Sequence, residues 1–306
     1  MVGGDVVFLV NPAAGNGAAG EKWAELSRQA AAAGLRGDAL LSEAPGHITE
    51  LTRRAVSEGA GRLVVVGGDG TVNEAVNGLL ESRSATPELA VVPLGTGDDF
   101  ARTFRLPTRP DEAFQVAAAG AVRTIDAGRA QFQDWDGSGA ERYFANFAGA
   151  GISGAIARRG AATSRRMGAR AAYLWATVAV FLRWKSIRME VELDESTRSE
   201  VLYEVLVANG AYTAGGMRVA PDAVPDDGQF DAVLIGDFTK AEFAVTFPKI
   251  YRGTHVGHRK VDVVRASVVG VSAQELLPVV LDGEQPGTTP ARFEIVPAAI
   301  RLRVPV

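Results

Sequence analysis

Short apolar, β-branched runs alternate with alanine-rich segments along the first 125 residues. The runs VVFLV, DALLS, RLVVV and LAVVPL predict strands. The segments near residues 22–33, 49–57, 72–81 and 111–119 predict amphipathic helices. Because strands and helices alternate, we expect a mostly parallel sheet with helices on both faces.

The pattern changes from about residue 124 onward. Runs such as RYFANFAG, SIRMEVEL, YEVLVANG, FDAVLIG, KVDVVRASVVGVS and LPVVL are separated by Gly, Pro and Asp. They predict antiparallel strands, with QDWDGSGAE as a hairpin loop. Only residues 164–183 and 240–252 have a helical pattern there, so the second domain is predicted to be a β-sandwich.

Length and composition agree with a folded protein of two domains. The chain has 306 residues, 47% of them hydrophobic and 22% charged. The absence of cysteine excludes disulfides, thiolate metal sites and a cysteine nucleophile. The N-terminal run follows Asp5 and no basic residue, which favours a first strand over a signal peptide. The longest uncharged helical stretch has 12 residues, so no membrane-spanning helix is expected and a cytoplasmic location is compatible.

Charge is distributed unevenly along the chain. The formal net charge of −4 gives no general reason to expect nucleic-acid binding. Residues 151–190 hold eight basic residues and one acid, which is +7, so the remainder carries −11. The apolar, aromatic run AAYLWATVAVFLRW lies inside this basic stretch. Such a composition is typical of an anchor on anionic lipid, although a core helix with solvated ends has the same pattern.

A glycine-rich loop follows the strand RLVVV directly. It reads Gly67-Gly68-Asp69-Gly70-Thr71-Val72-Asn73-Glu74 and leads into a predicted helix. Backbone N–H groups and a helix N-terminus then converge on one point, which forms a cradle for an anion such as phosphate. A tight strand-to-helix turn without a ligand would have the same sequence. Asp69 adds a carboxylate for metal or proton chemistry.

Two further polar loops follow predicted strands. They are NPAAG, which begins at Asn11, and PLGTGDDFAR, which contains Gly95 and Thr96. The carboxyl ends of parallel strands meet at one edge of a sheet, so the three loops are expected to converge. Neither a P-loop nor a Rossmann fingerprint is present, and the sequence indicates a different phosphate-binding design.

Six sequence blocks together resemble the diacylglycerol kinase catalytic-domain family. They are the three loops above and the later segments YFANFAGAGISGAI, VANGAYTAGGMRVAPDAVPDDGQFD and LDGE. That family includes soluble bacterial lipid kinases and the sphingosine and ceramide kinases. The resemblance implies an NAD-kinase-like, three-layer α/β domain over residues 1–124, joined by a C-terminal tail over 296–306. It implies an antiparallel β-sandwich lipid-substrate domain over residues 125–295.

The resemblance also implies a set of site residues. The expected ATP contacts are Asn11, Ser42, Gly67, Gly68, Asp69, Gly70, Thr71, Val72, Asn73, Glu74, Gly95 and Thr96. The segment VPDDGQFD is similar to the family's structural Mg²⁺ loop, which would use Asp227 and the carbonyls of Val224 and Gln229. A simple Asp-Asp-Gly turn is the other interpretation of that segment.

The acids of LDGE match the family's essential acidic pair. We take Glu284 as the preferred general base, with Asp282 orienting it or sharing a proton or a metal ion, while Asp69 remains the other candidate base or Mg²⁺ ligand. Without the resemblance, a hairpin turn is the other interpretation of DGE. One position departs from the family pattern, because Asp98 stands where Asn is usual. His255 and His258 are interpreted as structural.

The sequence therefore predicts an ATP- and Mg²⁺-dependent lipid kinase that contacts an anionic membrane surface transiently. An NAD kinase-like enzyme and a catalytically idle nucleotide- or lipid-binding protein are the alternatives. No motif marks the acceptor lipid, which leaves diacylglycerol, a sphingoid base and phosphatidylglycerol open. A homodimer is compatible with the sequence, which does not fix the oligomeric state.

Overall fold

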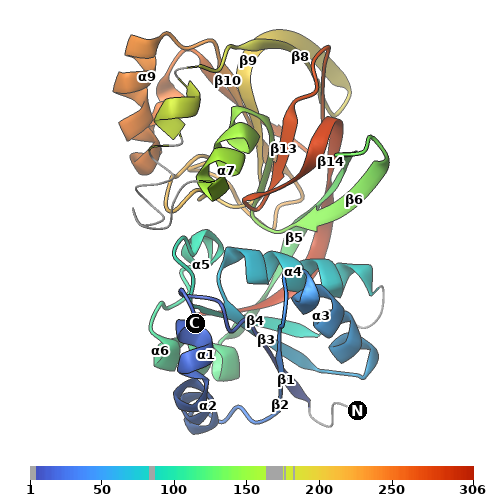
Figure 1. Cartoon of the computed structure of the whole chain (residues 1–306), viewed down its shortest axis with the longest axis vertical. Helices are drawn as coiled ribbons and strands as arrows, with labels where there is room; N and C mark the ends of the chain where they lie inside the picture. Colours follow the sequence, from blue (N-terminus) through green and yellow to red (C-terminus); the bar gives the residue numbers. More distant parts are fainter. Residues whose placement is uncertain (1–4, 83–86, 163–174, 176, 182) are drawn as a thin grey trace. The chain divides into compact units, whose positions relative to one another are not determined.

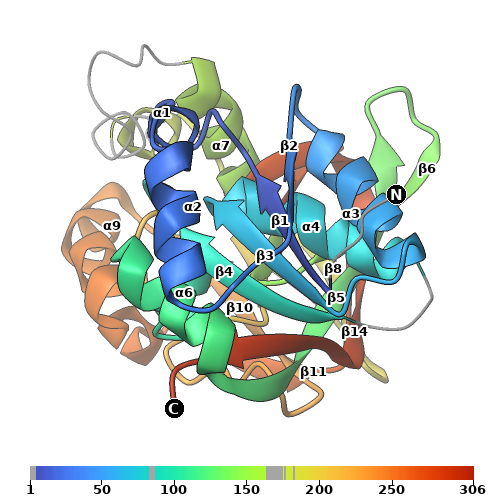
Figure 2. The same cartoon turned by 90° about the horizontal axis from the view of Figure 1, so that it is seen from below.

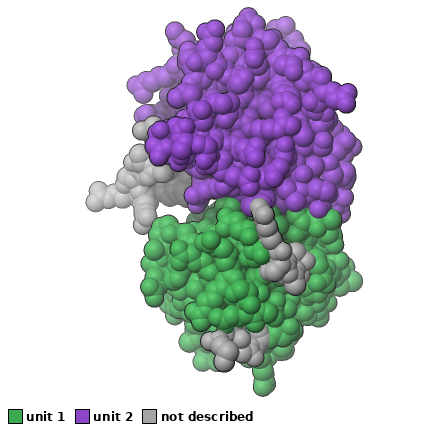
Figure 3. Space-filling view, turned by 90° about the vertical axis from the view of Figure 1, so that its right-hand side faces the viewer, with its two compact units in different colours: residues 1–126, 298–306 green, residues 127–297 purple. Residues whose placement is uncertain are grey.

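The computed structural model describes residues 5–82, 87–162, 175, 177–181 and 183–306. Its contacts divide the chain into two compact units, which Figure 3 shows in different colours. Unit 1 contains Met1–Asp126 and Ala298–Val306, and unit 2 contains Ala127–Pro297. The chain thus crosses between the units twice.

Four strand pairs of the sheet in unit 1 are parallel. Its strands are β1 (Val6–Val10), β2 (Asp38–Leu41), β3 (Arg62–Gly67) and β4 (Glu88–Pro93), together with the last residues of β14 (Glu284–Val304). Their order is β2-β1-β3-β4-β14. The end of β14 returns from unit 2 and pairs through Arg301 and Leu302 with β4.

Helices cover both faces of this sheet (Figure 2). They are α1 (Ala18–Glu21), α2 (Trp23–Ala32), α3 (His47–Ser57), α4 (Asp69–Glu81), α5 (Asp99–Thr103) and α6 (Pro110–Ala119). On one face, α2 and α6 pack against alternate strand residues such as Phe8 and Val64, with Phe114 fully buried. On the other face, α3 packs against α4. Strands buried on both faces explain the continuous β-branched runs in the sequence.

Unit 2 consists mainly of antiparallel strands (Figure 1). They are β5 (Ala121–Asp134, which starts in unit 1), β6 (Gly139–Phe144), β7 (Phe147–Gly151), β8 (Ile187–Leu193), β9 (Ser196–Ala208), β10 (Phe230–Gly236), β11 (Val261–Ala266), β12 (Val268–Ala273), β13 (Pro278–Leu281) and most of β14. The strands pair as β11-β10-β9-β7-β13-β14, while β8 joins β9 to β12.

Aromatic side chains fill the core of unit 2. Phe144 stacks on Phe230 at a ring-centroid distance of 5.5 Å and meets the edge of Phe293 at 6.1 Å. All three are fully buried. A Cβ atom at Gly128 would lie 2.0 Å from the Phe144 ring, so the strand opposite this ring requires glycine. The core therefore depends on side-chain shape as well as on hydrophobicity.

The helices of unit 2 differ in part from those expected. The described ones include α7 (Ile152–Ala162), α9 (Lys240–Thr246), and the 3₁₀ helices η2 (Phe247–Arg252) and η3 (Thr254–Gly257). The prediction of only two helical segments was wrong, because α7 begins directly after β7. Its glycine- and alanine-rich sequence has no strong apolar periodicity. The predicted basic helix over residues 164–183 falls mostly outside the described residues.

Among the helices that the structure describes, none is both long and apolar enough to cross a membrane.

Candidate functional site

The glycine-rich loop of unit 1 forms the start of helix α4. Strand β3 ends at Gly67, and Gly68 is the N-cap residue with extended backbone angles, φ −100° and ψ −170°. Its N-cap residue, as a glycine, has no side chain that could cap the first N–H groups. The first-turn N–H groups, including those of Gly70 and Thr71, therefore point out of the helix end toward the loop. This is the arrangement that binds phosphate oxygens.

Two of the converging loops touch through their backbones. A Cβ atom placed on Gly68 would lie 2.9 Å from the Cα of Gly95, and one on Gly95 would lie 2.8 Å from the Cα of Gly68. Real Cβ atoms do not approach backbone atoms so closely, so both positions require glycine. This contact brings the GGDG and GTG loops together at one edge of the sheet.

Asn11 connects the first loop to the helix start. Its Nδ2 donates to the Oγ1 of Thr71 at 3.0 Å, and its Oδ1 accepts from the N–H of Ala13 at 3.0 Å. Its own N–H donates to the carbonyl of Val66. One side chain thus fixes the NPAAG loop against the end of β3 and the first turn of α4.

The three loops and the β2–α3 loop line a polar cavity of about 660 Å³ in unit 1. A cavity of this size is large enough for a nucleotide-sized ligand. The predicted nucleotide residues in its lining are Asn11, Ser42, Gly68, Asp69, Gly70, Thr71, Glu74, Gly95 and Thr96.

Three of the predicted ATP contacts, Gly67, Val72 and Asn73, are not among the described residues that line this cavity. Val72 and Asn73 are buried in α4, and Asn73 accepts two hydrogen bonds from Asn77. The carboxylate of Glu74 lines the cavity, and it also accepts from the N–H groups of Gly46 and Ile48 at 3.0 Å each. Glu74 therefore caps the N-terminus of α3.

Two neighbouring carboxylates lie beside the glycines. Asp69 accepts from the N–H of Phe100 at 3.0 Å, and Asp98 accepts from the N–H of Gly95 at 2.9 Å. Burial, and then the nearby charge of Asp69, raise the pKa of Asp98. Asp98 has left-handed backbone angles, φ 50° and ψ 42°, which Asn and Asp both tolerate. The replacement of Asn by Asp therefore keeps the loop geometry and changes its charge.

The LDGE block forms a two-residue turn between β13 and β14. Asp282 and Gly283 both have positive φ, 45° and 92°, and Leu281 pairs with Glu284 across the turn. The carboxylate of Asp282 accepts from three consecutive backbone N–H groups, those of Ala145, Asn146 and Phe147, at 2.8, 3.0 and 2.9 Å. Asp282 thus holds the connection between β6 and β7, which is a positioning role.

Glu284 is the more accessible acid of the pair. Its carboxylate forms an ion pair with Arg142 at 3.1 Å, and its side chain is 46% exposed. An exposed carboxylate held by one arginine can still exchange that partner for a substrate hydroxyl, since such pairs contribute little energy.

The predicted Mg²⁺ ligand set includes one carboxylate, and this carboxylate already has other partners. Asp227 forms an ion pair with Arg265 and accepts from the N–H of Gln229 at 3.1 Å. Val224 is exposed in the same loop. One carboxylate and two carbonyls are a hard oxygen set that suits Mg²⁺, but Arg265 supplies the countercharge here. As arranged, the loop does not fit Mg²⁺. Within the described part of the chain, no cluster of three or more His, Cys, Asp or Glu residues could hold a metal ion.

Unit 2 contains a second cavity that the sequence did not reveal. It measures about 130 Å³ and is lined mostly by apolar side chains from α7, β9, α9 and η2. Rings of Tyr203, Phe181, Phe243 and Phe247 stack in a row with centroid distances of 5.2, 3.6 and 5.0 Å. A cavity of this size and composition stays dry and accepts apolar groups. Its volume is too small for a whole lipid.

One acidic side chain, Glu204 of β9, lies in the wall of this apolar cavity. It is 1% exposed, and its two oxygens accept from the N–H and the hydroxyl of Ser153 at 2.6 and 2.7 Å. Burial raises the pKa of Glu204 to about 8. No motif marked Glu204, and its only signal is a single acid within the apolar run YEVLVA.

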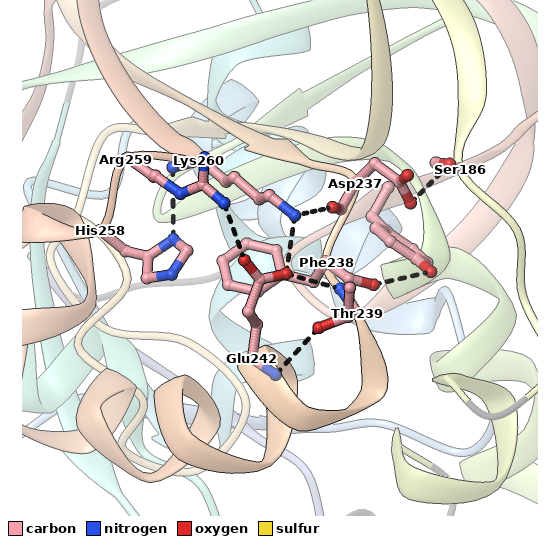
Figure 4. Close-up of polar contacts among 9 residues, drawn as sticks. Ser186, Asp237, Phe238, Thr239, Glu242, His258, Arg259 and Lys260 are labelled. Carbon is pink, nitrogen blue, oxygen red and sulfur yellow. Dashed lines mark hydrogen bonds and ion pairs between the residues drawn. The ribbon is translucent and has the colours of Figure 1, made fainter.

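Helix α9, which covers part of this cavity, is fixed at its start by a polar cluster (Figure 4). Thr239 and Glu242 form a capping box, and the Nζ of Lys260 donates to both Glu242 and the carbonyl of Asp237 at 2.6 Å. These hydrogen bonds from Lys260 and Thr239 lower the pKa of Glu242 to about 2. The cluster anchors the helix whose inner face contacts the cavity.

Two buried acids of unit 1 were not predicted as site residues. Asp99 begins α5, and Asp126 accepts from the N–H of Ala298 at 2.8 Å. Asp126 thus joins the two chain segments that leave unit 1. The histidines have structural contacts. Buried His255 donates through Nε2 to the carbonyl of Val219 at 3.1 Å, and His258 stacks on Phe238 at 4.7 Å.

Comparison with known proteins identifies the class that this fold and these loops define. A profile described as the diacylglycerol kinase catalytic domain matches residues 5–130. A second profile, the YegS C-terminal NAD kinase beta sandwich-like domain, matches residues 146–304. The chain therefore belongs to the diacylglycerol kinase family, which confirms the resemblance seen in its motifs.

Curated relatives agree with this assignment, and solved structures share the fold. A diacylglycerol kinase of Staphylococcus carnosus is 30% identical over 262 residues, covering 85% of this chain and 82% of the relative. A diacylglycerol kinase of Mycobacterium tuberculosis is 29% identical over 306 residues, covering 99% and 96%. A Bacillus anthracis protein assigned as a diacylglycerol kinase has a TM-score of 0.80 at 24% identity, covering 98% and 94%. An Archaeoglobus fulgidus NAD kinase in complex with ATP shares the fold, with a TM-score of 0.51 at 15% identity and coverage of 98% and 92%.

Proposed function

We propose that this protein is an ATP- and Mg²⁺-dependent lipid kinase that phosphorylates the hydroxyl group of a diacylglycerol-like lipid. The observation that carries the proposal is the presence, in one chain of this kinase family, of two cavities of opposite character. Unit 1 has a polar cavity of about 660 Å³ beside a helix N-terminus, and unit 2 has an apolar cavity. The relatives named diacylglycerol kinase support the lipid as acceptor.

In the proposed reaction the lipid hydroxyl oxygen attacks the γ-phosphorus of ATP. The bond between that phosphorus and the bridging oxygen breaks, ADP leaves with the electron pair, and the hydroxyl proton passes to a carboxylate. Glu284 is the proposed base because it is exposed, whereas Asp282 is used to hold backbone N–H groups. The α4 terminus would bind phosphate oxygens. Mg²⁺ bound with ATP would neutralise phosphate charge, and Asp69 would hold it.

We further propose transient contact with an anionic membrane surface from the cytoplasmic side. The described part of the predicted basic segment has two faces. Trp175 and Val178 are 54% and 37% exposed, while Thr177 and Phe181 line the apolar cavity. Exposed apolar side chains beside an apolar cavity, within a basic stretch of sequence, are typical of an interfacial anchor.

The direct test is product analysis. Purified protein is incubated with γ-labelled ATP, Mg²⁺ and mixed micelles of diacylglycerol, a sphingoid base or phosphatidylglycerol, with NAD as a parallel acceptor. We expect label in phosphatidic acid. Labelled NADP would instead assign the protein as an NAD kinase, whose fold it shares. Bound ATP without any labelled product would favour a catalytically idle binding protein.

A further inference from the structure

Glu204 has an environment that is unusual for an acid. Its neighbours in the cavity wall include Ile152, Ile156, Phe147 and Leu206, and its side chain is almost completely buried. Ionisable side chains are rarely buried unless they have a partner or a function. Glu204 does have a partner, Ser153, but this is a neutral one.

The position of this carboxyl group is built into the neighbouring strand. Gly151 of β7 is paired with Glu204, and Gly149 lies two residues earlier on the same strand. A Cβ atom on Gly149 would lie 2.7 Å from Oε1 of Glu204, and one on Gly151 would lie 3.0 Å from Oε2. Two glycines thus leave room for the carboxyl group, and Ser153 fixes both of its oxygens.

Keeping an acid here costs stability. The ordinary pKa of a glutamic acid side chain, 4.5, is raised in the fold to about 8. Between these pH values the folded chain retains a proton that the unfolded chain releases, so folding becomes less favourable as the pH rises from 4.5 to 8. The side chain is therefore mostly neutral near pH 7.

The neutral form changes what the pair presents to the cavity. The Oε2 atom accepts from the N–H of Ser153, so the acid proton can lie on Oε1 and be donated to the Ser153 hydroxyl oxygen. The serine hydroxyl is then released as a donor. The serine side chain lines the cavity, so this donor is available to an oxygen acceptor in a ligand.

We propose that Ser153 and Glu204 form the specificity-determining pair of the apolar cavity, donating a hydrogen bond to an ester carbonyl oxygen of an uncharged glycerolipid. This inference rests on the proposed lipid kinase function. In this proposal, the part of the acyl chain next to the ester binds in the apolar cavity. It also disfavours a sphingoid base, since an ammonium group would need an ionised carboxylate.

A purely structural role for Glu204 is the competing explanation, because its carboxyl group accepts from Ser153 at the N-terminus of α7. A glutamine could accept the same hydrogen bond without the cost of a buried acid. A structural role predicts an effect of substitution on the melting temperature alone. The proposed role predicts an effect on ligand choice.

The test measures binding without ATP. Displacement of a fluorescent diacylglycerol analogue from the full-length protein is measured with 1,2-dioleoylglycerol and with its dioleyl ether analogue, which lacks the carbonyl oxygens. Wild type should bind the diester about ten-fold more tightly at pH 7, since one hydrogen bond contributes about 1.4 kcal/mol. Ser153→Ala, which removes the donor, should reduce this ratio to about one. Glu200→Gln, an acid on the same strand outside the cavity, is the control and should leave the ratio unchanged.

A pH series separates the two roles further and does not depend on a variant that could unfold. The wild-type ratio should fall as the pH rises from 7 to 9, whereas the ratio of Glu204→Gln should not change with pH. Tyr203 and His255 are the other ionisable side chains of the described lining, and both remain in the glutamine variant. Equal binding of both lipids by wild type, an unchanged ratio in Ser153→Ala, or tighter binding of a sphingoid base would overturn the assignment. Because binding needs no ATP, a preserved ratio without phosphoryl transfer would count against the kinase function and support the pair.

Discussion

The nucleotide-sized cavity of unit 1 and the apolar cavity of unit 2 are built in opposite ways. In unit 1, backbone N–H groups and close glycine contacts form a polar cavity, with Asn11 and Asp69 as supports. In unit 2, large side chains from elements far apart in sequence form an apolar cavity with one buried acid, Glu204. Backbone geometry suits a ligand group common to all nucleotides, namely phosphate. Apolar side chains suit a hydrocarbon group, with a few polar groups to fix its orientation.

The largest effect is expected from the acid pair Asp282 and Glu284. Substitution of Glu284 should affect catalysis, and substitution of Asp282 should affect stability. Glu284→Gln should lower kcat about 10²- to 10⁴-fold, the usual contribution of a general base. The melting temperature of this variant should not change, since the exposed ion pair between Glu284 and Arg142 contributes little to the stability of the fold. Phosphoryl-transfer kinetics and thermal unfolding are the measurements.

Asp282→Ala is the matched variant in the same turn. It leaves the N–H groups of Ala145, Asn146 and Phe147 without their acceptor, so the melting temperature should fall clearly. Near-normal turnover in Glu284→Gln would remove it as the base. An unchanged melting temperature in Asp282→Ala would contradict its positioning role.

A second, smaller effect should appear when the glycine contact of unit 1 is disturbed. A methyl group on Gly95 would lie 2.8 Å from the Cα of Gly68, so Gly95→Ala must separate the two loops. We expect at least a ten-fold rise in the Kd for ATP, measured by calorimetry, with lipid binding unchanged. Gly139→Ala is the control, because nothing lies within 4 Å of its added Cβ. Equal changes in the Kd for ATP in Gly95→Ala and Gly139→Ala would mean that the close approach of Gly95 and Gly68 does not matter for ATP binding.

A third prediction concerns the charge of the unit 1 cavity. Asp98→Asn keeps an acceptor for the N–H of Gly95 but removes a negative charge close to Asp69. The KM for ATP should fall about two- to five-fold at pH 8, because like charges beside the ATP phosphates repel. The difference in KM between variant and wild type should shrink as the pH falls. Because the pKa of Asp98 is raised, its carboxyl group is protonated, and so uncharged, at a higher pH than an ordinary aspartate. A KM ratio that does not vary with pH would rule out this charge effect.

The smallest effect is expected on the acid stability of unit 2. Glu242 has its pKa lowered from 4.5 to about 2, so its stabilising effect is complete above pH 4.5 and is lost as the pH falls toward 2. Near-ultraviolet circular dichroism should therefore show a steeper loss of structure over that range in wild type than in Glu242→Gln. Identical acid profiles would show that the cluster with Lys260 does not stabilise α9.

The sequence predicted the parts of this molecule that depend on local pattern. The parallel strand pairs of unit 1 follow from β-branched runs, and the loop around Gly68 was identifiable because a strand, several glycines and a helix are consecutive. Helix α7 was missed because ISGAIARRGAA has little apolar periodicity. Val72 and Asn73 were predicted as ATP contacts although helix geometry buries them in α4.

The sequence could not predict features that depend on long-range packing. The three N–H groups held by Asp282 are about 136 positions away, and the pairing of Asp227 with Arg265 joins a turn to a separate strand. Glu204 and Ser153 are 51 positions apart and meet only because β7 pairs with β9. Single acids in apolar runs therefore need the strand register before they can be interpreted.

The most direct test of the account is a two-substrate kinetic measurement on wild type, Gly95→Ala and Glu204→Leu, using labelled ATP and dioleoylglycerol micelles. The account predicts that Gly95→Ala raises only the KM for ATP and that Glu204→Leu raises only the KM for the lipid. An increase in the KM for ATP in Glu204→Leu, with the KM for the lipid unchanged, would contradict the division of the two substrates between the two units.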